Sequence, residues 1–189
     1  MWMCINDGVI GASGSIRNYS YLVKKVIFPV DIIPLISLFA NSFVALFLFI
    51  VATAVCLIVG FSCNVLVLIY AIFAAYCFLI AFTRFTSAIC TVVPDFSNLL
   101  TIMMQLFFWA TPIVWDISML SEHPIISTII QCMPFTYLVT SFRNSFMSGN
   151  IITANNGMFT IIFWVVTFIM FIWGNYIFKK SKKDFADVL

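Results

Sequence analysis

Three long stretches of this chain carry no charged residue, and this pattern constrains the fold more than any other feature. No Asp, Glu, Lys or Arg occurs from Ile32 through Thr83, from Phe96 through Trp115, or from Asn144 through Phe178. A helix that crosses the hydrocarbon core of a bilayer needs about 20 mostly apolar residues. Only 8% of the residues are charged, whereas a soluble domain carries roughly a quarter to wet its surface. Lipid is therefore the solvent for most of this chain.

The charge-free stretches predict an all-α, polytopic transmembrane helical bundle, with 1–189 as a single domain. The first stretch is too long for one crossing, and the glycine-bearing segment 60–64 is the polar break near its middle. Strands of a membrane barrel would be about ten residues long with alternating polarity, which is not seen here. We therefore expect four spans, at about 33–59, 65–84, 97–116 and 157–178.

Basic residues flank both ends of the spanning region, which predicts its orientation. Cytoplasmic loops are enriched in Lys and Arg, and four crossings place both ends on the same side. We expect both ends to be cytoplasmic, 117–156 to face outward, and the chain to lie in the cytoplasmic membrane. Arg84, near the inner end of the second span, can extend its side chain to the interface. The flanking cations are Arg17, Lys24 and Lys25 before the first span, and Lys179, Lys180, Lys182 and Lys183 in the tail 179–189.

The segment 7–31 is expected to be cytoplasmic and to contain an amphipathic helix over 16–28. Apolar side chains recur there at spacings of three and four, with the basic residues on the other side. Pro29 is expected to end the helix, because the residue before a proline disfavours helical geometry. Such a helix either lies along the membrane surface or docks into a groove on a cytoplasmic partner.

Aromatic residues crowd around Pro112 at the end of the third span. They are either an aromatic belt at the outer interface or rings that line a path, since aromatic faces pack against sugars. Pro112 itself removes a backbone hydrogen bond, which is tolerated in a membrane where neighbours satisfy the freed group. The aromatic residues are Phe107, Phe108, Trp109 and Trp115.

The outward segment contains two short apolar stretches separated at Pro134. Each is too short to cross the bilayer, which favours re-entrant or interfacial half-helices. Tyr137 lies in the second stretch, and Arg143 and Asn144 follow it. Polar residues beside half-helices at the outer face indicate either a gate or a cap on the bundle.

The residues needed for catalysis inside the membrane are missing from the sequence. Apart from Asp116 at the outer edge of the third span, Arg84 is the one charged residue in the expected spans, and His123 beside Glu122 is explained by a solvated loop. The phosphate-binding motif GxxxxGK[ST] is absent. We therefore expect a chain that is not an enzyme, binds no cofactor or metal itself, and has no nucleic-acid partner. If something is pumped, the energy enters from another subunit.

Four segments, in order, resemble the membrane subunit of type-2 ABC exporters for polysaccharides, teichoic acid or O-antigen. LVKKVIFPVDIIPL at 22–35 resembles that family's cytoplasmic stretch before a span, and the segment 94–115 resembles the span that ends in its TPI-W motif. The segment 133–149 resembles its outer element, and FKKSKKDFADVL at 178–189 resembles its C-terminal signature. The four segments are distributed from residue 22 to residue 189, so the resemblance extends over nearly the whole chain.

The resemblance implies a permease that pairs with a second copy and with ATP-binding subunits, which hold ATP and Mg. It implies export of a lipid-linked glycan, with the aromatic residues near Pro112 along its path and the outer half-helices as a gate. The gate residues are Pro134, Tyr137, Arg143 and Asn144. The coupling residues toward the ATP-binding subunit are Arg17, Asn18, Tyr19, Leu22, Lys24 and Lys25.

Members of that family carry further crossings ahead of the matching region, so the chain is expected to be truncated at its N-terminus. Three other readings of the sequence remain open. The first is a permease of the same broad class for a drug or another lipid, and the second is a truncated fragment without activity. The third is a membrane-embedded enzyme of lipid or glycan assembly, against which the missing ionisable pairs argue.

Overall fold

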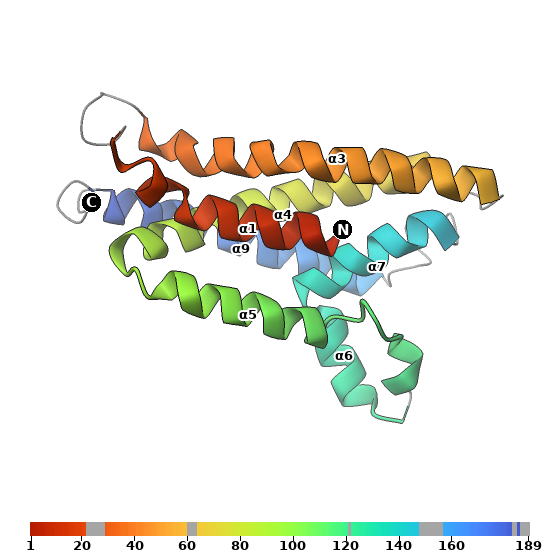
Figure 1. Cartoon of the computed structure of the whole chain (residues 1–189). Coiled ribbons are helices and arrows are strands. Elements are labelled where there is room, and N and C mark those ends of the chain that lie inside the picture. The colour runs from red at the N-terminus through yellow and green to blue at the C-terminus, as the bar shows by residue number, and fades with distance from the viewer. Residues whose placement is uncertain (22–28, 60–63, 121, 148–156, 183–184, 186–189) are drawn as a thin grey trace.

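The computed structural model describes residues 1–21, 29–59, 64–120, 122–147, 157–182 and Phe185. Every regular element within them is helical, and the long helices lie side by side in one bundle (Figure 1). This confirms the expected all-α, polytopic bundle. The elements are α1 (Trp2–Asn18), η1 (Val30–Ile32), α3 (Ile33–Val59), α4 (Val65–Val92), α5 (Phe96–Ala110), η2 (Ile117–Leu120), α6 (Pro124–Cys132), α7 (Pro134–Met147) and α9 (Gly157–Ser181).

Three helices, α3, α4 and α9, are long and apolar enough to cross a membrane. A fourth span exists if α6 and α7, which meet at a bend of 87°, are counted as one broken span. At 1.5 Å per residue the 25 residues of α9 reach about 37 Å, more than the roughly 30 Å hydrocarbon core. α4 continues to Val92, beyond the expected end at residue 84, so Arg84 lies inside the helix.

The expected third span over 97–116 is corrected to the 15-residue helix α5, which ends at Ala110. Thr111 takes an extended conformation with φ of −80° and ψ of 139°. The ring of Pro112 disfavours the helical region for the residue before it, and this ends the helix. A helix of this length reaches about 22 Å, short of a full crossing.

Helix α1 was not expected, because its three glycines disfavour a helix in water. It packs against α3 and α4 (Figure 1), and the apolar side chains of Ile5, Val9, Ala12 and Ile16 are fully buried. Their spacing of four, three and four places them on one face. Ile16 therefore lies in the last turn of α1 and does not start the expected helix over 16–28, of which residues 22–28 lie outside the described part of the chain.

Both flanks of the spanning region meet at one end of the bundle. The Nζ atom of Lys182, just after α9, lies 2.5 Å from Oδ2 of Asp31, just before α3. A small apolar cluster joins the same region: Ile16, Val30, Ile33, Ala88, Phe178 and Phe185. The expectation that the two flanks share one side is therefore consistent with the fold, while the assignment of that side to the cytoplasm stays a prediction.

Candidate functional site

The broken helix pair α6–α7 is fixed to the bundle at its far end. Pro134 is the first residue of α7 and lies at the bend, as expected from the sequence. At the other end of α7 the carbonyl oxygen of Ser145 accepts a 3.0 Å hydrogen bond from the backbone N–H of Asn64. The side chain of Asn64 in turn caps α4 through the N–H groups of Leu66 and Val67. The end of α7 is therefore held against the start of α4, opposite the end where Asp31 meets Lys182.

Arg143 joins α7 to the irregular segment that follows α5. Its Nη2 donates to the carbonyl oxygens of Pro112 at 2.8 Å and Ile113 at 3.1 Å. Its Nη1 lies 3.6 Å from Oδ2 of Asp116. Carbonyls after a helix end lack intrahelical partners, and the guanidinium presents its donors in a planar fork that can serve two of them. Arg143 therefore stabilises the chain break that Pro112 causes.

Asp116 is the anionic member of this arrangement. The backbone and side-chain hydrogen bonds from Ser118 hold the pKa of Asp116 below its ordinary value, with a smaller contribution from Arg143. The backbone N–H of Ser118 lies 2.9 Å from Oδ1 of Asp116. Since the carboxylate is largely exposed, its ion pair with Arg143 is screened by water and contributes little to stability.

A cavity of about 420 Å³ lies beside Arg143. Apolar side chains from α1, α3 and α7 form most of its wall, among them Trp2, Ala52, Phe142 and Phe146, and Arg143 is its one charged side chain. An apolar wall with one convergent cation is the usual form of a small-molecule site. Asn144, the neighbour of Arg143 in sequence, is half-buried.

Tyr137 ties the middle of α7 to α4 and α9 through a chain of hydrogen bonds. The hydroxyl of Tyr137 lies 2.8 Å from that of Tyr70 and donates to Oγ1 of Thr160 at 3.3 Å. The indole N–H of Trp164 donates to Tyr70 at 3.0 Å. An indole N–H can only donate, so the Tyr70 hydroxyl accepts from Trp164 and donates to Tyr137, and the Tyr137 hydroxyl donates to Thr160. The hydrogen bonds in such a chain polarise and strengthen one another.

Substituting Tyr137 with Phe is expected to lower the free energy of unfolding by about 0.5–1.5 kcal/mol per lost hydrogen bond. The ring, stacked on Phe163 at a centroid distance of 4.4 Å, would be retained. Thermal unfolding in detergent measures the effect. Tyr176→Phe, on an exposed side chain of α9, is the matched control. Equal shifts for both variants would show that the hydroxyl chain does not stabilise α7.

The five residues expected along a translocation path make several different contacts. Phe107 packs on Phe135 of α7, with ring centroids 5.0 Å apart, and Phe108 packs on Trp2 of α1. Trp109 is exposed, and its carbonyl oxygen accepts a 3.1 Å hydrogen bond from the indole of Trp115. The structure thus assigns packing contacts to two rings, while a role in a path stays a prediction for all five, Pro112 included.

The expected coupling residues lie at or beyond the end of α1. Arg17, Asn18 and Tyr19 are exposed there. Leu22, Lys24 and Lys25 fall outside the described residues, so the structure does not place them. No interaction with a partner subunit can be tested in a single chain, and this assignment stays a prediction.

Sequence reasoning missed a polar contact between α4 and α9. A guanidinium nitrogen of Arg84 donates to Oδ1 of Asn175. The neighbour of Asn175, Gly174, makes this approach possible, because a Cβ atom there would lie 2.9 Å from the carbonyl oxygen of Ala81. Small residues at such contacts let membrane helices approach closely. The signal available in the sequence was a glycine next to a polar residue, Gly174 and Asn175, shortly before the basic tail.

These features define the class: the chain is a polytopic α-helical membrane protein with a broken helix pair at one end of its bundle. No family model matches it. It is 21% identical, over 98% of its length and 71% of the relative, to the O-antigen export system permease protein RfbA of Myxococcus xanthus. It is 32% identical to the protein of that name from Klebsiella pneumoniae, over 50% of this chain and 34% of the relative. The resemblance to export permeases that the motifs indicated is thereby confirmed.

Proposed function

We propose that the chain is the permease subunit of an ATP-driven ABC exporter that moves a lipid-linked polysaccharide outward across the cytoplasmic membrane. The observation that carries the proposal is similarity over 98% of the chain to a protein named as an O-antigen export permease. The bent pair α6–α7 supports it, because it lies in the outward segment 117–156, where two short half-helices were expected and where the resemblance implies a gate. Teichoic acid is a second glycan of the same class.

In this proposal α7 is the moving part of the gate and Arg143 holds it closed. The contacts of Arg143 with Pro112 and Ile113 join α7 to α5, and the contact of Ser145 with Asn64 joins it to α4. Opening requires that these polar contacts break together. The cavity beside Arg143 is then the space into which the glycan enters.

In this proposal the chain is a transport subunit, and the catalytic chemistry of the cycle belongs to partner subunits. ATP and Mg would bind to the partner subunits, and two copies of the permease would enclose the path. The end of the bundle with Asp31 and Lys182 would face the cytoplasm and receive the ATP-binding subunit, in keeping with its basic flanks.

Co-purification tests the coupling segment. The double charge reversal Lys24→Glu with Lys25→Glu is expected to abolish retention of the ATP-binding subunit, because the docking cations become anions. The matched control is Lys179→Glu with Lys180→Glu, which reverses two exposed cations on the last turn of α9 and is expected to retain it. Loss of the ATP-binding subunit from both double variants would indicate a general effect of charge and would contradict the assignment of the coupling segment.

Export itself is tested in inside-out membrane vesicles that contain the permease and the ATP-binding subunit. Addition of ATP is expected to move a labelled lipid-linked glycan into the vesicle lumen. ATP-dependent movement of a hydrophobic drug without movement of the glycan would overturn the substrate class. Chemistry on the glycan without the ATP-binding subunit would overturn the transport role.

A further inference from the structure

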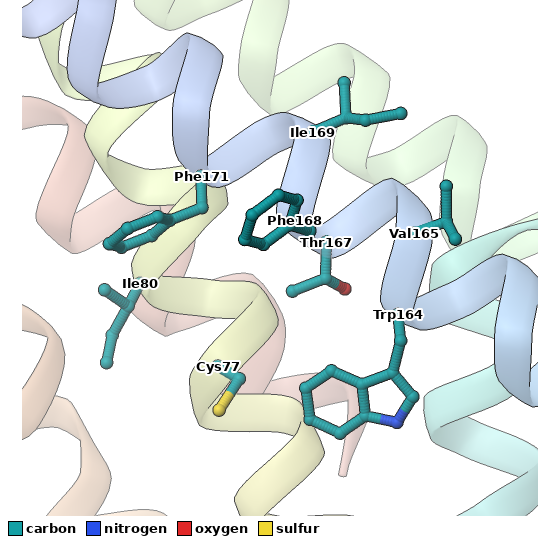
Figure 2. Close-up of a pocket in the computed structure, with 8 residues that line it drawn as sticks. All are labelled: Cys77, Ile80, Trp164, Val165, Thr167, Phe168, Ile169 and Phe171. Atoms are coloured by element: carbon teal, nitrogen blue, oxygen red, sulfur yellow. The ribbon is translucent and has the colours of Figure 1, made fainter.

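A groove of about 570 Å³ lies between α4 and α9, on the surface of two helices long enough to span the membrane. Figure 2 shows that α4 contributes Cys77 and Ile80 and that α9 contributes the other lining residues. Cys77 and Ile80 are close to the middle of α4, and Thr167 and Phe168 are close to the middle of α9. In a bilayer the groove would therefore lie near the midplane, within the hydrocarbon core.

The groove offers its occupant no charge and, apart from the weak donor of the Cys77 thiol, no unpaired hydrogen-bonding group. Thr167 is its one hydroxyl residue, and that hydroxyl already donates to the carbonyl oxygen of Phe163 at 2.8 Å. The indole N–H of Trp164 already donates to Tyr70. The remaining lining is aliphatic or aromatic apart from the Cys77 thiol. An occupant with polar groups would leave them unsatisfied at this depth, which costs several kcal/mol for each group.

A second protein helix fits this groove poorly. Helices that pack in membranes use small residues at the contact, because these let the backbones approach. Here the exposed side chains are large, with Phe168 65% and Phe171 43% exposed. The small residue of this half of α9, Gly174, already faces α4.

We propose that the groove holds an acyl chain of a bilayer phospholipid and that this chain supports Trp164 in the position from which it bonds Tyr70. Nothing in the groove selects a head group, so the most abundant hydrocarbon of the membrane occupies it. Trp164 forms part of the groove wall and also starts the hydrogen-bond chain to Tyr137 of α7. The packing of the half-helix α7 thus depends on lipid in the groove. This inference does not require that the chain exports a glycan.

Photolabelling in native membranes tests the occupant. A phospholipid with a diazirine in the middle of one acyl chain is activated by light, and the adducts are mapped by mass spectrometry. Adducts at Cys77, Thr167 or Phe168 are expected several-fold above those at Phe43 and Phe47 of α3, although these two are 76% and 65% exposed. Equal labelling would mean contact with bulk lipid only and would overturn the proposal.

Two variants separate the groove from the general surface. Cys77→Phe is expected to remove the groove adducts by filling the space while leaving the adducts on α3 unchanged. Ile80→Phe fills the same groove from the next turn of α4 and is used instead if Cys77→Phe fails to fold. Preferential labelling by a diazirine on a polyprenyl phosphate, or Cys77–Cys77 cross-links between two copies, would assign the groove to another occupant and overturn the proposal.

A second measurement tests the coupling to Trp164. Removal of lipid in detergent is expected to weaken the indole N–H hydrogen bond, and return of phospholipid is expected to restore it, as read from the indole bands in ultraviolet resonance Raman spectra. In this experiment the other four tryptophans are replaced by Phe. An N–H band that does not respond to lipid would overturn the dependence of α7 on the groove.

Discussion

Gly174→Ala is expected to destabilise the bundle by about 1–3 kcal/mol, the usual cost of forcing an extra carbon into a packed interface. The added Cβ would lie 2.9 Å from the carbonyl oxygen of Ala81 and 3.3 Å from the backbone nitrogen of Phe85. Both are backbone atoms of α4, so the two helices must move apart. The separation would also carry Asn175 away from Arg84 and leave that guanidinium without its partner in the span.

Gly157→Ala is the matched control, because a Cβ atom at Gly157 has no atom within 4 Å. Alanine is the better helix former by roughly 1 kcal/mol, so this variant is expected to be neutral or stabilising. Unfolding of both variants is followed by circular dichroism in mixed detergent micelles. Destabilisation of similar size at both positions would contradict the role given to Gly174.

Arg143→Lys is expected to release α7 from the segment after α5, with a loss of about 1.5–3 kcal/mol for a hydrogen bond made by a charged donor. Nη2 of Arg143 serves both carbonyls while Nη1 faces Asp116, and a lysine ammonium is a single point charge that lacks this planar pair of nitrogens. Hydrogen exchange at the amides of 111–116, followed by mass spectrometry, is expected to accelerate. If the proposed gate is correct, the variant also leaks substrate or loses export.

Asp116→Asn is the control for this variant, because it keeps both carbonyl contacts of Arg143. Little change in hydrogen exchange at 111–116 is expected, since the carboxylate is exposed and its ion pair is weak. The pH dependence follows the same reasoning. The folded-state pKa of Asp116 is lowered, so its small contribution is present above the ordinary pKa and is lost as the pH falls through the lowered value. Faster exchange in Asp116→Asn than in Arg143→Lys would assign the stabilisation to the ion pair instead of the carbonyls.

The spanning helices could be predicted because their signal is local. Long apolar runs almost free of charge specify α3, α4 and α9 whatever their neighbours, since each helix satisfies its own backbone groups in lipid. Proline acts through the residue beside it, and this made the break at Pro134 predictable. The same rule shortens α5, where Pro112 ends the helix at Ala110; the sequence reading had let that span continue to residue 116.

Helix α1 and the partner of Arg143 could not be predicted in the same way. Glycine disfavours a helix in isolation, and α1 is stabilised by burial of Ile5 and Val9 against α3 and α4. The sequence placed Arg143 near a half-helix but contained no information about which carbonyls it would reach. Pro112 lies 31 positions away in sequence.

The sequence by itself determined that lipid surrounds most of the chain, that the fold is helical, that both flanks are basic and that the chain resembles export permeases. These depend on composition and short motifs, which do not change when the helices are rearranged. The tertiary structure alone decided which helices touch, that Gly174 allows α4 and α9 to meet, and that Arg143 and Tyr137 hold α7. Those contacts join residues far apart in the chain, so they form only when the helices pack. Packed side chains exclude lipid, and each polar group must then find its partner within the bundle.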